Sequence, residues 1–227
     1  MIRRSWQQDL FAEKSFGTLY RTARKHVAVA GNNRIAIYVF LAALLPLLAG
    51  FSGLWNPVSV SALIAGIRSV ATLGVGFATS ILGFLVSGFA LFFAITRSDV
   101  LVLLAGVSHD EGDISRLQFI LYSFMYVFLQ YIVFLGATLG ISATLMQGSL
   151  LVSTAIYWRD ACPNAFWILA AIGFSGLAAW LTFILLQLKS FIWNLFQTVL
   201  VAITVGADMD SGRLKKVIDE IKRGESE

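Results

Sequence analysis

The chain has 227 residues, of which 58% are hydrophobic and only 13% are charged, whereas soluble domains carry about 25% charged residues. This composition excludes an ordinary water-soluble domain, and the single cysteine, Cys162, excludes an intrachain disulfide. The formal net charge of +4 comes mostly from Lys and Arg in the two terminal segments, beside apolar stretches. Anionic lipid headgroups are therefore the expected partner, and nucleic acid is not.

Residues 1–34 precede the first apolar stretch and are too long and too polar for the start of a cleavable signal peptide. They interleave seven Lys or Arg with apolar side chains. This mixture is typical of an amphipathic helix lying on the cytoplasmic membrane surface. A solvated basic tail is the alternative.

Five stretches without a charged side chain are the candidates for membrane spans. A helix needs about 20 apolar residues to cross the hydrocarbon core, so four stretches are long enough and the fifth, 190–207, is marginal. The stretches cover 35–67, 69–96, 117–158, 161–188 and 190–207.

Four spans are placed at about 35–55, 69–95, 117–145 and 165–188. The segment 56–68 should be a short external connection with a turn of helix on the surface. The charged loop 96–116 contains an apolar piece, VLVLLAG, which should dip against the membrane. Trp167, near the start of the fourth span, should lie at the level of the lipid headgroups.

The segment after Lys189 is expected to form a continuous or bent amphipathic helix below the bilayer, because its polar residues share one helical face. In the final segment, apolar residues at i, i+3, i+4 and i+7 predict a small helix that docks a cytoplasmic partner. These docking residues are Leu214, Val217, Ile218 and Ile221. The domain organisation is thus a cytoplasmic segment 1–34, a transmembrane domain 35–188 and cytoplasmic helices 189–227.

The distribution of basic residues predicts the orientation. With four crossings, the inner segments hold seven, two and six Lys or Arg, and the outer ones hold only Arg68 and Arg159. Both termini should then lie in the cytoplasm, and a bacterial inner membrane is the expected location. The predicted fold is an all-α transmembrane bundle with four spans; six spans are the alternative.

Small and hydroxyl residues recur along the second, third and fourth spans and predict faces that another helix can approach closely. Such faces can pack within the chain or between copies of it. The predicted packing residues are Thr72, Gly76, Ser80, Gly83, Ser87, Gly136, Gly140 and Gly173.

Two polar residues near or within the spans have open roles. Arg68 can anchor the outer headgroups or face a polar vestibule. Gln130 can bond a neighbouring helix or line a pore. No Asp, Glu or His lies mid-span, which disfavours an ion-coupled transporter.

The sequence contains no catalytic motif, since neither histidine can pair with a serine inside the spans. The cluster HDEGD at 109–113 matches no metal-binding spacing, so a solvated turn is expected there. We expect neither enzymatic activity nor a cofactor or metal.

The leading functional hypothesis is a membrane subunit that packs or oligomerises through its glycine-rich faces and docks a cytoplasmic partner. A narrower form is a sensor in a bacterial stress or phage-defence pair. The alternative is a channel or pore formed by several copies.

Overall fold

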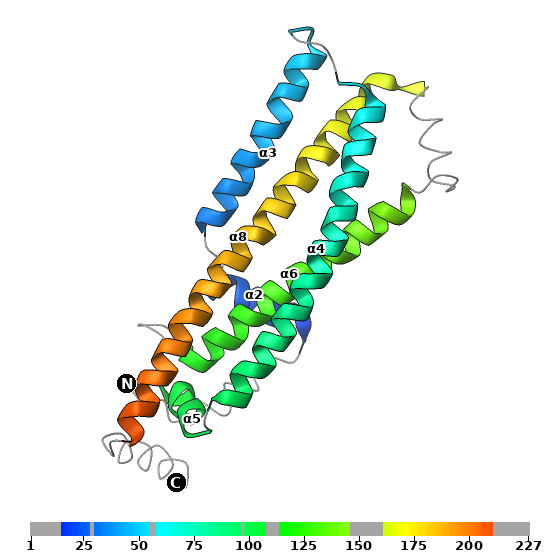
Figure 1. The fold of residues 1–227 in the computed structure, drawn as a ribbon. Helices are drawn as coiled ribbons and strands as arrows, with labels where there is room; N and C mark the ends of the chain where they lie inside the picture. Colours follow the sequence, from blue (N-terminus) through cyan, green and yellow to red (C-terminus); the bar gives the residue numbers. More distant parts are fainter. Residues whose placement is uncertain are drawn as a thin grey trace. The chain divides into compact units, whose positions relative to one another are not determined.

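The computed structural model describes residues 15–27, 30–54, 58–96, 98–107, 114–145 and 161–210. Within these ranges the regular structure is helical and includes no β-strand (Figure 1). The helices are α2 (Phe16–Val27), α3 (Ala30–Phe51), α4 (Val60–Ile95), α5 (Ser98–Gly106), α6 (Arg116–Thr144) and α8 (Pro163–Asp210).

Four of these helices are long and apolar enough to cross a membrane. Their candidate spans are Gly31–Phe51, Val60–Ala94, Arg116–Thr144 and Pro163–Thr204. The all-α fold with four spans is therefore confirmed, and the third span matches its predicted bounds most closely.

The helix ends have identifiable caps. Ser115 and Gln118 form a reciprocal capping box at the start of α6, with Ser115 N donating to Gln118 Oε1 at 2.8 Å and Gln118 N donating to Ser115 Oγ at 3.2 Å. At the end of α3, Gly53 has a φ of 89°, and Leu54 N donates to Ala49 O at 3.1 Å. This Schellman arrangement terminates α3 before the predicted end at residue 55.

The second long helix begins earlier in the sequence than the predicted second span. Helix α4 begins at Val60, and Ser59 caps it by accepting a hydrogen bond from Ala62 N at 3.2 Å. Because 60–67 contains no helix breaker other than Gly66, the expected surface turn is the first part of the same helix. Arg68 consequently lies inside α4.

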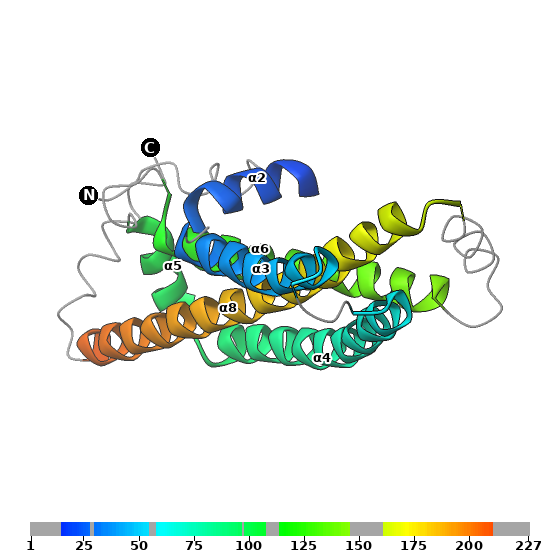
Figure 2. The ribbon, with the colours of Figure 1, turned by 90° about the horizontal axis from the view of Figure 1, so that it is seen from above.

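Helix α8 has 48 residues and runs past Lys189 without interruption (Figure 2). At about 1.5 Å per residue it is much longer than the ~30 Å hydrocarbon core. The continuous form of the helix after Lys189 is confirmed. Among the described residues, 190–204 forms no separate crossing, which favours four spans over six.

One compact unit contains α3, the first part of α4, the second part of α6 and the first part of α8. Its core joins α4 and α8 through Leu63, Trp167, Ala170 and Ala171, with leucines of α3 packed against them. Trp167 is only 5% exposed, and its Nε1 donates to Val58 O at 2.7 Å. Its ring also stacks on Phe51 with centroids 4.6 Å apart. Trp167 is therefore covered by neighbouring helices of this chain, and its position at the level of the headgroups stays a prediction.

The other unit contains α2, α5 and the remaining parts of α4, α6 and α8. Helix α2 buries Ala23 and Val27 while Arg21, Arg24 and Lys25 stay exposed. The amphipathic helix is thus confirmed over 16–27.

The apolar side chains of α5 pack against protein in the same unit. Val100, Leu104 and Ala105 form a cluster with Leu117 of α6, and Val201 of α8 packs against it. The apolar piece VLVLLAG is therefore covered by helices of this chain, whereas contact with the membrane had been expected for it.

Candidate helix-packing surfaces

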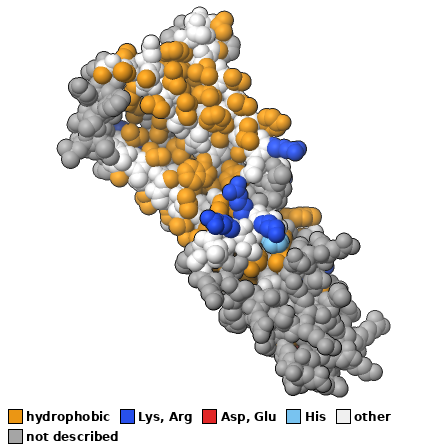
Figure 3. Space-filling view, turned by 180° about the vertical axis from the view of Figure 1, so that it is seen from behind, with side chains coloured by type: hydrophobic (Ala, Val, Ile, Leu, Met, Phe, Trp, Pro, Cys, Tyr) orange, Lys and Arg blue, Asp and Glu red, His pale blue; other side chains and the backbone are white. Residues whose placement is uncertain are grey.

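Large hydrophobic side chains are exposed along the outer faces of the long helices. Tyr38, Leu73 and Leu169 are each more than 60% exposed, at 67%, 63% and 67%. Figure 3 shows one face of the molecule on which hydrophobic side chains cover a broad area. Apolar patches of this kind are rare on soluble monomers and are expected where lipid is the solvent.

Two glycines of α4 allow its close approach to neighbouring helices. A Cβ at Gly74 would lie 2.9 Å from Phe134 Cε1 and 3.0 Å from Thr138 Cγ2, both in α6. A Cβ at Gly66 would lie 2.9 Å from Phe174 Cε2 of α8. Neither glycine was among the predicted packing residues. Gly74 shares a face with Ala71 and Ala78, which are fully buried, and this small-residue spacing was the available signal.

The small-residue face predicted for α4 points away from the chain's own helices. Thr72, Gly76, Ser80, Gly83 and Ser87 are all exposed. A Cβ at Gly76 or Gly83 would meet no atom of the described residues within 4 Å.

The predicted glycine pair of α6 is exposed in the same way. Gly136 and Gly140 are exposed, and a Cβ at either position would meet no atom within 4 Å. Gly173 of α8 differs, because its Cβ would make an ordinary contact with Ile67 Cδ1 of α4 at 3.6 Å. Close packing within the chain therefore uses Gly66 and Gly74, and the predicted glycines of α6 leave an open surface.

The contacts between α6 and α8 include a buried hydrogen bond. Tyr131, which is fully buried, donates its hydroxyl to Ile184 O at 3.1 Å. One turn away, the rings of Phe134 and Trp180 meet edge to face with centroids 5.4 Å apart. In a membrane, where apolar burial contributes little between helices, such polar and shape-matched contacts hold helices together.

Arg68 links α4 to the end of α6. Its guanidinium donates a hydrogen bond to the carbonyl of Leu145, just past the last residue of α6. The last carbonyls of a helix have no partner within the helix, and a cation is favourable at a helix C-terminus. This contact was not among the roles considered for Arg68.

The remaining predicted residues are only partly described. Gln130 is half-buried and has an interaction within the chain. The docking residues Leu214, Val217, Ile218 and Ile221 and the HDEGD cluster lie outside the described residues.

Four long apolar helices with large hydrophobic side chains on their outer faces define this chain as a helical membrane protein. In comparisons with known proteins, no family model, no curated protein and no solved structure matches the chain.

Proposed function

We propose that this protein is a non-catalytic membrane subunit that associates with a second copy of itself through the glycine-bearing outer faces of α4 and α6. The observation that carries the proposal is the open space beside Gly76, Gly136 and Gly140, all of them exposed. Glycines at such spacing let two helix backbones approach closely, which is how helices associate in lipid.

The competing explanation is that the same faces contact only lipid. The hydroxyls of α4 are compatible with lipid, because Thr79 Oγ1 donates to Val75 O at 2.8 Å and Ser80 Oγ donates to Gly76 O at 2.9 Å. Exposure to lipid therefore costs these side chains little. An experiment on the oligomer must separate the two explanations.

The test replaces Gly136 and Gly140 together by leucine, and Gly76 by leucine in a separate variant. Ala42→Leu on α3 is the matched control, because Ala42 is also small and exposed. Native mass spectrometry in nanodiscs should show a wild-type oligomer that the glycine variants lose and Ala42→Leu retains. A wild-type monomer, or an oligomer that survives the glycine changes, would contradict the proposal.

The same subunit is proposed to dock a soluble cytoplasmic protein through Leu214, Val217, Ile218 and Ile221. Their helical spacing and the basic residues around them support this role. Deleting residues 208–227 should release the partner and leave thermal unfolding of the transmembrane helices unchanged. Identical co-purifying proteins with and without this tail would refute docking through it.

A sensor role in a bacterial stress or phage-defence pair is the narrower form of this proposal. Its support is the small amount of sequence expected outside the membrane and the larger cytoplasmic segments. A genetic test is to delete the neighbouring gene and measure whether phage protection or the stress response is lost in parallel with loss of this protein.

A channel formed by several copies is the second candidate. The observation that favours it is the exposed row of hydroxyls on α4 at Thr72, Ser80 and Ser87; Gln130 is the other proposed lining residue. Conductance by the purified protein in planar bilayers would support a channel. A strict monomer in native nanodiscs would count against both the channel and the dimer.

A further inference from the structure

A pocket with both polar and apolar walls lies within the unit that contains α2 and α5. Its volume is about 330 Å³, which is at the lower end of the ~300–1,000 Å³ typical of small-molecule sites. The start of α6, the last part of α8 and one residue of α5 line it. The lining residues are Leu104, Arg116, Phe119, Ile120, Asn194, Gln197, Thr198 and Val201.

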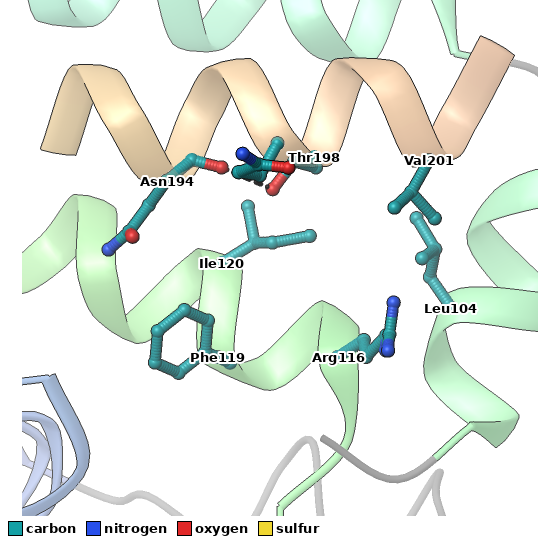
Figure 4. Close-up of a pocket in the computed structure, with 8 residues that line it drawn as sticks. Leu104, Arg116, Phe119, Ile120, Asn194, Thr198 and Val201 are labelled. Atoms are coloured by element: carbon teal, nitrogen blue, oxygen red, sulfur yellow. Dashed lines mark hydrogen bonds between the residues drawn. The ribbon is translucent and has the colours of Figure 1, made fainter. Parts of the chain in front are cut away.

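Arg116 supplies the only charge among the described lining residues. Figure 4 shows its side chain rising from the start of α6 into the pocket, toward Leu104 and Val201. Its Nε is buried and has no hydrogen-bond partner among the described residues. A buried guanidinium nitrogen without an acceptor is costly, so the pocket is suited to an oxyanion.

Polar side chains of α8 line the same pocket as this arginine. Asn194 reaches from α8 toward α6 (Figure 4), and Gln197 and Thr198 belong to the same lining. Thr198 Oγ1 already donates to Asn194 O at 2.8 Å. The two side-chain amides are therefore the neutral donors best placed to assist the guanidinium.

The backbone N–H groups of the first turn of α6 contribute less to anion binding than the side chains do. Arg116 N donates to Val107 O at 3.0 Å, and Gln118 N donates to Ser115 Oγ. Because these N–H groups are occupied, recognition of an anion must rest on side chains, and chiefly on Arg116.

The rest of the lining and the adjacent surface of α8 are apolar. Leu104, Ile120 and Val201 form apolar walls. On the neighbouring face of the same turns, Trp193 and Phe196 are 61% and 52% exposed, with ring centroids 6.0 Å apart. A ligand with an anionic head and a long apolar tail matches both surfaces, since the pocket is too small for the tail.

From this arrangement we infer that the pocket binds the phosphate group of an anionic phospholipid. Arg116 pairs with the phosphate oxygens, Asn194 and Gln197 hydrogen-bond the headgroup, and the acyl chains lie along the exposed apolar face of α8. Arginine suits this role because its planar fork matches phosphate oxygens. None of the lining residues belongs to the glycine faces of the proposed dimer.

The experiment measures lipid retention by the delipidated full-length protein in native mass spectrometry. The probes are phosphatidylglycerol, the zwitterionic phosphatidylcholine, and inorganic phosphate. Wild type should retain phosphatidylglycerol in preference to phosphatidylcholine. Arg116→Gln should weaken this retention about tenfold, the usual effect of losing one charge-assisted hydrogen bond.

Two further variants keep the test decisive. Lys189→Gln removes the same charge from an exposed position on α8 and should change retention little. Gln197→Leu should weaken retention of phosphatidylglycerol while its thermal unfolding stays as in wild type. This variant replaces Arg116→Gln as the test if Arg116→Gln does not fold. Equal retention in wild type, Arg116→Gln and Gln197→Leu would overturn the inference. Binding of inorganic phosphate without preference for phosphatidylglycerol would also overturn the assignment to a lipid.

Discussion

Glycine has two different environments along α4, although the residues are only a few positions apart. Gly74 lies against Phe134 and Thr138, whereas Gly76 faces outward with no atom within 4 Å of a Cβ. The first position is fixed by packing within the chain, and the second leaves room for a neighbour from outside it.

This difference predicts that the same substitution has different effects on stability at the two glycines. Gly74→Leu should destabilise the folded chain by about 1–3 kcal/mol, because the added side chain must displace the ring of Phe134. Gly76→Leu should leave the stability of the monomer unchanged. Thermal unfolding of both variants in detergent, followed by tryptophan fluorescence, measures the difference. Equal stability of the two variants would contradict the assignment of the faces.

The hydroxyl of Tyr131 gives a second prediction at the residue scale. Tyr131→Phe removes the hydrogen bond to Ile184 O and keeps the ring in place. Interhelical hydrogen bonds in membranes contribute about 0.6 kcal/mol on average and at most about 1.7 kcal/mol, so a modest loss of stability is expected. Unfolding by a denaturing detergent should detect it, with Tyr38→Phe, an exposed position, as the control. A Tyr131→Phe variant as stable as Tyr38→Phe would show that this bond contributes nothing.

The packing residues were only partly predictable from the sequence. Spacing identified small-residue faces on α4 and α6, but the same periodicity fits the buried row Ala71, Gly74 and Ala78 and the exposed row Thr72, Gly76 and Ser80. Which row packs inside the chain depends on the positions of α6 and α8. The sequence of α4 alone does not determine these positions.

At the scale of elements, local hydrogen bonds determine where the helices begin and end. The capping box of Ser115 and Gln118 fixes the start of α6 at Arg116. This start lies within one residue of the predicted start of the third span. Helix α4 begins before the predicted second span, because the turn of helix expected within 56–68 continues into the span without a break. The contacts of Trp167 with other helices were not predicted, because an aromatic residue near a span end suits both a headgroup belt and a contact between helices.

The cap of α6 predicts a measurable loss of stability. Ser115→Ala should destabilise the chain by about 1 kcal/mol, because Gln118 N loses its acceptor. Ser69→Ala, at an exposed position inside α4, should have little effect and serves as the control. Chemical denaturation of the two variants in the same detergent measures both values. No difference between them would mean that the cap does not stabilise α6.

At the scale of the whole molecule, the four apolar helices and the distribution of Lys and Arg predict that successive connections lie on alternate sides of the membrane. The count of four was predictable because charged residues separate four apolar stretches that are each long enough to cross a membrane. The length of α8 was harder to predict, because Lys189 is a single charge within a helix that continues to Asp210. A long side chain can bring its charge to the headgroups without ending the helix.

The most direct test of the four-span account uses cysteine labelling in intact cells. Cys162 is the natural cysteine and is exposed; Ser15, Ser52 and Ser98 are exposed near the ends of other helices and can each be changed to cysteine in a Cys162→Ser background. A membrane-impermeant maleimide should label Cys162 and the Ser52→Cys variant in intact cells, and the Ser15→Cys and Ser98→Cys variants only after permeabilisation. Labelling of all four positions from one side of the membrane would contradict the account.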